Sequence, residues 1–381
     1  MSIRESYYEF FNFRNKPIQL LSEKTINDYY INEEQQIRKI KNYLEIRRLR
    51  GEITNSLALK PTVFIAVKQC NWEKDALVDS WKNVANIIHY DWGNKYDQYS
   101  NTWYEKEKNL FNQELYDKVY QANKRNKIDL FFSYLSGRWV FPETIKRIRD
   151  LGIITINYDF DDSLKFWGYK EKGCFTGSVN IAPVYDICIT AQSKKNVGKY
   201  IYAGANPLFM SSGGNEKLFA KEGFKLKRDI KISFIGQKYG KRQEIIEYLY
   251  KKGISVYVRG LGWNEGSVSQ EEMVNIFSNS LLVLGIGYIG DTKKTALKGR
   301  DFEVPMTGAA YITTYNDELS NYFNENREII FYENKDELVN KIKYYLNNST
   351  EAIQIGYYGR RKALNDYKWQ NKWEKIIDIV R

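Results

Sequence analysis

From residue 61 onward, short runs of apolar residues alternate with longer segments in which apolar residues recur every three or four positions. A short apolar run predicts a buried strand, and the helical period predicts an amphipathic helix. Buried strands that alternate with helices predict a parallel sheet covered on both faces. In the first half of the chain, strands are expected at residues 61–67, 86–91, 128–135, 153–160 and 185–191, and helices at 75–85, 109–126, 141–152 and 193–204.

The same alternation begins again after residue 229 and predicts a second domain of similar size. Its strands are expected at residues 231–236, 254–260, 281–287, 309–314 and 328–333, and its helices at 241–253, 269–280, 302–308, 316–323 and 335–348. Residues 206–229 predict an interdomain linker that turns at Gly213–Gly214. The fold class is therefore α/β, with two Rossmann-like parallel-sheet domains facing across a cleft. Ligands of such sheets bind at the carboxyl ends of the strands, so the cleft is the expected site.

The expected division has an N-terminal helical extension (1–60), an N-terminal domain (61–213), a C-terminal domain (214–360) and a final helix (361–381) that packs back on the N-terminal domain. Within the extension, residues 33–53 predict a helix that ends at Gly51. Its apolar positions are Ile37, Ile40, Leu44 and Ile46. This helix either packs on the first domain with a solvated outer face, or rests on a membrane as a basic amphipathic helix.

Composition excludes several kinds of chemistry. His89 is the only histidine, so a zinc site with two imidazoles is excluded, and the general base of any reaction is expected to be a carboxylate. His89 itself is expected to be a half-buried residue at a strand end. Cys70, Cys174 and Cys188 are too few and too scattered for a disulfide framework.

The chain carries 58 Lys and Arg against 47 Asp and Glu, a net charge of +11. These charges are interleaved along the chain, and no basic arm or nucleic-acid motif appears, so no nucleic-acid partner is expected. The start lacks the apolar stretch of a signal peptide, and the longest apolar run is far shorter than a bilayer requires. A cytoplasmic location is expected, with or without peripheral contact at the inner membrane face.

Two segments of the second half could hold a phosphorylated ligand. A strand ends at Gly236 and a helix begins near Lys241–Arg242, so free helix amides and the Arg242 guanidinium could bind phosphate. An ordinary turn with a solvated arginine is the alternative. Glu303 begins a short helix that Gly308 closes, and a carboxylate there could bind both hydroxyls of a ribose. Lys298 and Arg300 could neutralise a diphosphate; alternatively, these residues and Asp301 form a surface salt-bridge cluster.

The motif NYDFDDS, from Asn157 to Ser163, follows a predicted strand of the first half. Asp159 and Asp161 form the D-x-D spacing of a metal site, but their place in the N-terminal domain favours a role toward an acceptor. Asp161 or Asp162 could act as general base, or simply bind the acceptor hydroxyl. A strand-end Asp that caps the next helix is the alternative. Arg138, in SYLSGRWVF, follows another strand and could contact the acceptor or only its own loop.

The segment RDFEVPMTGAAYITTYNDELSNYFNENREIIFYENKDELVNKIKYYLNN resembles the C-terminal half of the CgeB-like (spore-maturation-type) glycosyltransferases of the GT-B fold. SFIGQKYGKR, VYVRGLGW and IFSNSLLVLGIG fall in that family's order. The resemblance implies transfer of a sugar from a nucleotide-sugar donor, bound by the C-terminal domain, to a glycan, lipid-linked or protein acceptor. The implied donor-binding residues are Glu303, Arg242, Arg300, Lys298, Gly236 and Tyr239.

One position departs from the family pattern. Many retaining relatives carry two glutamates eight positions apart, and Thr295 stands at the first of them here. This leaves the donor sugar and the stereochemical outcome open. The leading hypothesis is a metal-independent glycosyltransferase without a cofactor, with Asp161 and Asp162 as catalytic residues and Asp159 and Arg138 on the acceptor side. A non-catalytic nucleotide or sugar sensor is the alternative, and a nucleic-acid-binding protein is a third hypothesis.

Overall fold

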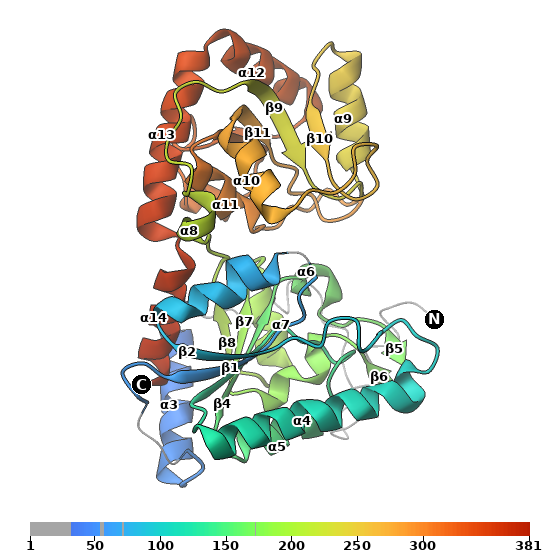
Figure 1. The fold of residues 1–381 in the computed structure, drawn as a ribbon, viewed down its shortest axis with the longest axis vertical. Helices are drawn as coiled ribbons and strands as arrows, with labels where there is room; N and C mark the ends of the chain where they lie inside the picture. The colour runs from blue at the N-terminus through green and yellow to red at the C-terminus, as the bar shows by residue number, and fades with distance from the viewer. Residues whose placement is uncertain (1–31, 54–56, 71, 172) are drawn as a thin grey trace. The chain divides into compact units, whose positions relative to one another are not determined.

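A computed structural model describes residues 32–53, 57–70, 72–171 and 173–381 (Figure 1). The predictions for residues 1–31 lie outside these described residues. Contacts divide the chain into two compact units. Unit 1 consists of Met1–Glu73, Trp81–Ser211 and Trp373–Arg381, and unit 2 of Lys74–Ser80 and Ser212–Lys372.

Unit 1 contains a six-stranded sheet in which every neighbouring pair is parallel. The strand order is β2-β1-β3-β4-β7-β8. The strands are β1 (Thr62–Ala66), β2 (Asn86–Tyr90), β3 (Leu130–Ser133), β4 (Ile154–Asp159), β7 (Ile187–Thr190) and β8 (Pro207–Phe209). The central strands β3, β4 and β7 are buried on both faces, as their uninterrupted apolar runs predict. All five strands predicted for this half are confirmed.

Helices and aromatic side chains cover both faces of this sheet. The helices are α3 (Glu33–Leu49), α4 (Lys108–Arg125), α5 (Pro142–Arg149), α6 (Asp162–Lys165) and α7 (Val197–Tyr202). Shorter π- or 3-10-helical turns lie at Trp103–Glu107, Ser178–Asn180, Ala182–Val184 and Lys194–Asn196. Two further turns, at Glu73–Val78 and Asp79–Asn83, contain the segment Lys74–Ser80 that belongs to unit 2. Trp139 and Phe111 pack together with ring centroids 5.3 Å apart in the core under α4. Elsewhere in the unit, Trp373 of α14 (Trp369–Val380) stacks on Trp81 at 4.3 Å.

Two predictions for this half are wrong in detail. Residues 206–229 are not purely a linker, because β8 is the sixth strand of the sheet and α8 (Glu216–Phe219) follows it. Pro207 begins β8 at the sheet edge, where its missing N–H costs no hydrogen bond of the sheet. Because β8 has only three residues, it is too short to show the hydrophobic pattern of a strand in the sequence. Residues 75–85 form consecutive π- and 3-10-helical turns instead of one helix. A small hairpin of β5 (Lys170–Glu171) and β6 (Cys174–Phe175) was not predicted.

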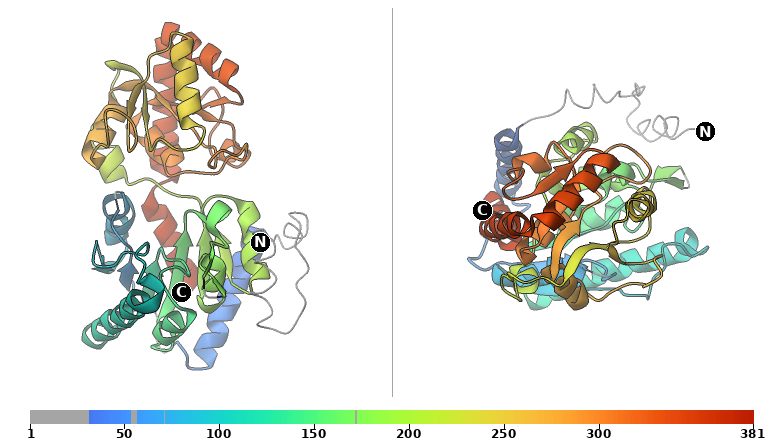
Figure 2. Two further views of the ribbon diagram at one scale, coloured as in Figure 1. Left: turned by 90° about the vertical axis from the view of Figure 1, so that its right-hand side faces the viewer. Right: turned by 90° about the horizontal axis from the view of Figure 1, so that it is seen from above.

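Unit 2 contains a second all-parallel sheet, of order β10-β9-β11-β12-β13. The strands are β9 (Ile230–Ile235), β10 (Tyr257–Arg259), β11 (Ser280–Leu284), β12 (Ala310–Thr314) and β13 (Ile330–Tyr332), all at predicted positions. The helices are α9 (Arg242–Lys251), α10 (Gln270–Ser278), α11 (Arg300–Thr307), α12 (Lys335–Asn347) and α13 (Ser349–Asp366), with a 3-10 turn at Leu319–Asn321. α9 packs with α12 (Figure 2), and α11 packs with α13 and β12. The predicted final helix from residue 361 is instead the end of α13 followed, after a break, by α14.

Helix α3 packs on unit 1 at the edge strand β8. Asn32 caps it in a reciprocal capping box with Gln35, and Gly51 follows it with φ of 71°. The buried Gln36 side chain accepts a hydrogen bond from the Phe209 amide at 3.0 Å, so it occupies a backbone donor of the sheet edge. The packing agrees with the first interpretation of this helix.

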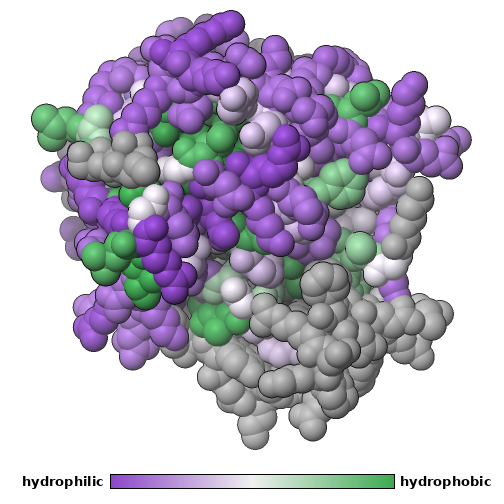
Figure 3. All heavy atoms as spheres, turned by 90° about the horizontal axis from the view of Figure 1, so that it is seen from below, coloured by the Kyte–Doolittle hydropathy of each residue, from purple (hydrophilic) through white to green (hydrophobic). Residues whose placement is uncertain are grey.

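One of the four predicted apolar positions of α3 does not face the unit, and Ile37 is half-buried. Ile40 and Leu44 are buried, whereas Ile46 is 48% exposed. Seen from below, the visible described residues are mainly hydrophilic, with hydrophobic side chains in small separate groups (Figure 3). Among the described residues, no helix has the length and apolar character needed to cross a bilayer. Peripheral membrane contact stays a prediction.

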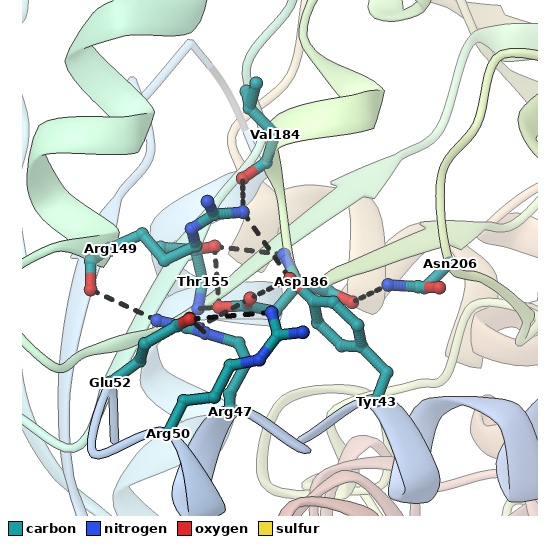
Figure 4. A network of polar contacts seen from close by, with 9 residues as sticks. All are labelled: Tyr43, Arg47, Arg50, Glu52, Arg149, Thr155, Val184, Asp186 and Asn206. Carbon is teal, nitrogen blue, oxygen red and sulfur yellow. Dashed lines mark hydrogen bonds and ion pairs between the residues drawn. The ribbon is translucent and has the colours of Figure 1, made fainter. Parts of the chain in front are cut away.

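A buried ion pair holds α3 to the amino-terminal edge of the sheet (Figure 4). The Arg47 guanidinium donates to Oδ1 of Asp186 at 2.7 Å, and both side chains are almost fully buried. Oδ2 of Asp186 accepts from the amide and the hydroxyl of Thr155 on β4, at 2.8 and 3.0 Å. Burial raises the pKa of Asp186, while the Arg47 charge and the Thr155 bonds oppose that effect. The pair therefore joins α3, β4 and the start of β7.

Replacing Arg47 should destabilise unit 1 strongly. Arg47→Ala leaves the Asp186 carboxylate buried without its counter-charge, and breaking a buried pair in this way costs about 3–5 kcal/mol. Arg50→Ala is the matched control, because Arg50 is 70% exposed and lies 3.9 Å from Glu52; such surface pairs contribute about 0–1 kcal/mol. Chemical denaturation of both variants measures the difference. If both variants lose an equally small part of the free energy of unfolding, the buried pair does not anchor α3.

Candidate functional site

The strand order of unit 2 places its candidate site. The chain runs from β9 outward to β10 and then returns to β11, so the order reverses between β9 and β11. At the carboxyl ends of β9 and β11, the loops that follow the strands lead in opposite directions. Ligands of open α/β sheets bind in the crevice between such loops. The loops are residues 236–241 after β9 and 285–299 after β11. Gly236, Tyr239 and Lys298 lie in these loops, and Arg242, Arg300 and Glu303 lie in the first turns of the helices that follow them.

Glycines bring the backbones of these loops into contact. Gly240 has φ of +56°, and a Cβ there would lie 2.4 Å from the carbonyl oxygen of Gly290. Gly260, after β10, has φ of +137°, and a Cβ there would lie 2.2 Å from the carbonyl oxygen of Gly236. Only glycine combines these conformations with such close approach. The edge of the sheet therefore presents backbone rather than side chains between β10, β9 and β11.

Arg242, Arg300 and Glu303 come together at this edge. Arg242 opens α9, and its Nη1 donates to the Gln237 carbonyl at 2.9 Å. Burial lowers the pKa of Arg242, and the nearby Arg300 charge adds to the effect. Arg300 opens α11 and forms an ion pair with Glu303, which is only 3% exposed. Burial raises the pKa of Glu303, and the Arg300 charge opposes it. Two guanidiniums and one carboxylate thus share one half-enclosed position.

Asp301, which the sequence pattern placed only in the alternative salt-bridge cluster, also belongs to this arrangement. Its buried carboxylate accepts the Tyr311 hydroxyl at 2.9 Å and the Lys298 amide at 2.7 Å. Burial raises its pKa to about 6, against the effect of these hydrogen bonds. Asp301 thereby fixes the start of α11 to β12. Since Asp301 and Glu303 are both buried, the alternative of a surface salt-bridge cluster is wrong. Only the burial, which the sequence does not display, separates the two interpretations.

The other donor-side residues occupy the rim. Gly236 accepts the Trp263 indole N–H at 2.8 Å, so this tryptophan is tied to the turn after β9. Tyr239 is 49% exposed, with its ring 6.0 Å from the Arg242 guanidinium. Lys298 is half-buried beside Asp301. Thr295 accepts the Asn316 amide at 3.0 Å and donates to the Tyr315 carbonyl at 3.3 Å.

In unit 1, the three aspartates after β4 have different surroundings. Asp159 is buried and accepts hydrogen bonds from the Ser178 hydroxyl and the Asp161 amide. Asp162 is fully buried and accepts the Asn196 amide at 2.6 Å. Burial raises the pKa of both Asp159 and Asp162. Asp161 is 46% exposed, and its Oδ2 accepts from Tyr134 at 3.1 Å and Lys165 at 3.0 Å.

These surroundings correct part of the prediction. The carboxylates of Asp159 and Asp162 are enclosed, so they are poorly placed to touch an acceptor, whereas Asp161 is accessible. Asp161 makes no side-chain cap to α6, so the capping alternative is not observed. In the part of the chain that the structure describes, the side chains of Asp159 and Asp161 accept hydrogen bonds from different donors, although both carboxylates interact electrostatically with Lys165. Among the described residues, no group of three or more His, Cys, Asp or Glu is arranged to hold a metal.

Neighbouring strands add residues to the same edge of unit 1. Arg138 donates to the Gln98 carbonyl at 2.9 and 3.2 Å and lies 4.5 Å from the Tyr99 ring, so it contacts its neighbouring loop. His89 is half-buried, as predicted, with Nε2 2.8 Å from the Val67 carbonyl. Tyr134, which follows β3, also belongs to this edge, because its hydroxyl donates to Asp161 after β4. No local pattern in the sequence signals that pairing.

Comparison with known proteins agrees with this geometry. Residues 241–378 match the family described as "Glycosyl transferase-like", which is less than half of the chain. This stretch contains Arg242, Arg300 and Glu303. No curated protein matches the chain significantly.

Solved structures share the fold at low identity. HepE of Anabaena in complex with UDP and glucose has a TM-score of 0.54 and 10% identity, covering 84% of this chain and 99% of HepE. Sucrose-phosphate synthase from Thermosynechococcus elongatus has a TM-score of 0.59 and 10% identity, covering 83% and 97%. A glycosyltransferase from Rickettsia africae has a TM-score of 0.55 and 11% identity, covering 85% and 99%. The chain has the GT-B fold, and together with the family match this supports a glycosyltransferase.

The pKa of Asp301 predicts how stability depends on pH. The unfolded carboxyl loses its proton near pH 4 and the folded one near pH 6, so stability should fall as pH rises between these values. The slope is at most about 1.4 kcal/mol per pH unit. Asp301→Asn removes it, so the melting temperature of the variant relative to the wild type should rise from pH 4 to pH 6. Asp317→Asn, at an exposed position, is the control. If the melting temperatures of Asp301→Asn and the wild type change in parallel between pH 4 and pH 6, the pKa of Asp301 is not raised.

Proposed function

We propose that the protein is a glycosyltransferase that moves a sugar from a nucleotide-sugar donor to an acceptor hydroxyl, within the CgeB-like group of the GT-B fold. The observation that carries the proposal is the cluster of Arg242, Arg300 and Glu303 at the glycine-lined edge of unit 2, inside the matched family segment. Donors of this kind present a diphosphate beside a ribose. Two cations and one carboxylate are the complementary set.

Each member of the cluster has a distinct role in the proposal. Arg242, at the amino end of α9, binds the diphosphate together with the helix amides. Arg300 is paired with Glu303 here and turns toward the diphosphate as the donor enters. Glu303 then accepts the ribose hydroxyls. Lys298, Gly236 and Tyr239 complete the rim of the site. HepE, which shares the fold, holds UDP and glucose, and UDP is the first donor nucleotide to test.

Asp161 is the general base of the proposal. Its Oδ2 is held by Tyr134 and Lys165, while Oδ1 accepts no hydrogen bond among the described residues. The acceptor hydroxyl gives its proton to Oδ1, and its oxygen bonds to the anomeric carbon. The bond from that carbon to the diphosphate breaks, and the electron pair leaves with the nucleoside diphosphate. Asp159 and Asp162 position the turn instead of touching the acceptor. That donor and acceptor meet in a cleft between the domains stays a prediction of the sequence.

Donor binding should depend on Glu303. Glu303→Gln loses the carboxylate that accepts the ribose hydroxyls, and hydrogen bonds to a charged group are worth about 1.5–3 kcal/mol, so affinity should fall roughly 10- to 100-fold. Binding is measured by titration calorimetry with UDP, GDP, ADP, CDP and dTDP in turn. Glu271→Gln, at a side chain that is 85% exposed, is the control. Unchanged affinity in Glu303→Gln would refute the ribose-binding role.

Transfer should depend on Asp161 without a matching effect on the donor. Asp161→Asn removes the base, and general base catalysis contributes about 10²- to 10⁴-fold in rate. Nucleotide affinity should stay unchanged, because Asp161 lies in unit 1. Turnover is followed as release of nucleoside diphosphate from the nucleotide sugar that binds best. If the turnover rate of Asp161→Asn falls only a few-fold, Asp161 contacts the acceptor without acting as its base. If the wild-type protein never releases nucleotide, it is a sensor and not an enzyme.

Activity should survive removal of divalent metals. Arg242, Arg300 and Lys298 supply positive charge where the diphosphate departs, which is the role a metal would otherwise take. The same release assay, run after dialysis against EDTA, should therefore give an unchanged rate. Loss of activity that manganese restores would overturn metal independence and return Asp159 and Asp161 to the role of metal ligands.

A further inference from the structure

Three aromatic side chains gather around Asp161 at the carboxyl edge of the unit 1 sheet. They are Trp72 after β1, Tyr134 after β3 and Phe160 after β4, and we call them the aromatic patch. The Phe160 ring meets Trp72 edge-on at 5.3 Å and Tyr134 edge-on at 5.0 Å. All three side chains are half-buried, so part of each ring remains accessible. The order of strands reverses between β1 and β3, so the patch lies at the place where an open sheet binds ligands.

The patch has a rigid support. Phe160 stacks on Tyr158, with ring centroids 4.4 Å apart and an interplanar angle of 23°. Tyr158 is fully buried, and its hydroxyl donates to the carbonyls of Met210 and Ser211 at 2.7 and 3.0 Å. The stacked pair therefore fixes the Phe160 ring before any ligand binds. A surface that is ordered in advance loses less conformational entropy on binding.

Two polar atoms that make no hydrogen bond to another described residue border the aromatic rings. Among the described residues, Oδ1 of Asp161 accepts no hydrogen bond and the Trp72 indole N–H donates none. The other oxygen of Asp161 is held by Tyr134 and Lys165, which fixes the direction of the carboxylate. The Trp72 amide is held by the buried Glu73 carboxylate at 3.1 Å, which also accepts the Cys70 amide at 3.0 Å. An apolar face is thus bordered by one fixed acceptor and one donor.

We propose that the aromatic patch binds the acceptor, and that the acceptor is a carbohydrate whose pyranose ring lies on Trp72 and Phe160. The proposal rests on the proposed function and adds the chemical class of its acceptor. A pyranose presents C–H groups on its faces and hydroxyls around its rim, so it matches an apolar face bordered by polar groups. One rim hydroxyl donates to Oδ1 of Asp161, where it is positioned for deprotonation. A lipid chain would leave that carboxylate without a hydrogen-bond donor.

Binding of simple sugars tests the proposal directly. The probes are the methyl glycosides of glucose, galactose, mannose and N-acetylglucosamine, detected by saturation-transfer NMR with the full-length protein. The wild type should give signals from at least one glycoside, and Trp72→Ala should weaken its affinity about tenfold or more. Phe160→Leu, which keeps an apolar side chain over Tyr158, should weaken it as well. Tyr169→Ala removes a ring that is 72% exposed elsewhere in unit 1 and should have no effect.

Two further measurements separate this proposal from the proposed function. Nucleoside diphosphate binding should be the same in the wild type, Trp72→Ala and Phe160→Leu, because both residues lie in unit 1. A chemical denaturation curve with the same transitions as the wild type shows that unit 1 of both variants folds. If a nucleoside diphosphate binds but no glycoside does, or if Trp72→Ala binds the glycoside normally, the carbohydrate proposal is overturned while the donor site stands. Transfer to a polyprenyl phosphate or to a peptide, with no transfer to any glycoside, would likewise overturn it. If no nucleoside diphosphate binds the wild type, the proposed function itself fails.

Discussion

Both units depend on one constraint, namely that every neighbouring pair of strands in their main sheets is parallel. A parallel connection must return from the carboxyl edge to the amino edge, so each strand is followed by a loop at the same edge. Residues that are distant in sequence therefore meet there. In unit 2 these are Arg242, Arg300 and Glu303, and in unit 1 they are Trp72, Tyr134 and Asp161. The chemistry of the protein follows from the direction of its strands.

Two buried ion pairs, one in each unit, differ in how far they are enclosed. At the amino edge of the unit 1 sheet, Arg47 and Asp186 form a closed pair. The second oxygen of Asp186 accepts from the Thr155 amide and hydroxyl, and the rest of the Arg47 guanidinium donates to the Glu52 carboxylate and the Arg149 carbonyl. At the carboxyl edge of unit 2, Glu303 is equally buried, but its partner Arg300 is one-third exposed and can exchange a carboxylate for a phosphate. The same kind of interaction is thus fully enclosed where it holds α3 to the sheet and half-open at the candidate site of unit 2.

The two candidate sites present different surfaces. In unit 2, glycines at positions 240 and 260 remove side chains, so backbone and cations line the edge. This suits a phosphate, which is recognised through charge and N–H groups. In unit 1, the edge is filled with aromatic rings around a single accessible carboxylate, which suits a neutral, amphipathic ligand. The contrast agrees with a division of labour between a charged donor and a hydroxylated acceptor.

The sequence by itself determined the elements. Alternating apolar runs predicted the ten strands other than β8 and the two strands of the small hairpin. Local signals located the start of α9 at Arg242 and the end of α11 at Gly308. Both kinds of prediction succeed because strand burial, capping and turns depend on a few adjacent residues. Tertiary structure alone decided which residues are accessible. Asp159, Asp161 and Asp162 are nearly equivalent in sequence, yet only Asp161 reaches solvent. The roles of Asp301, Tyr134 and Trp72 also depend on partners from other strands, since burial and long-range contacts arise only when the sheets assemble.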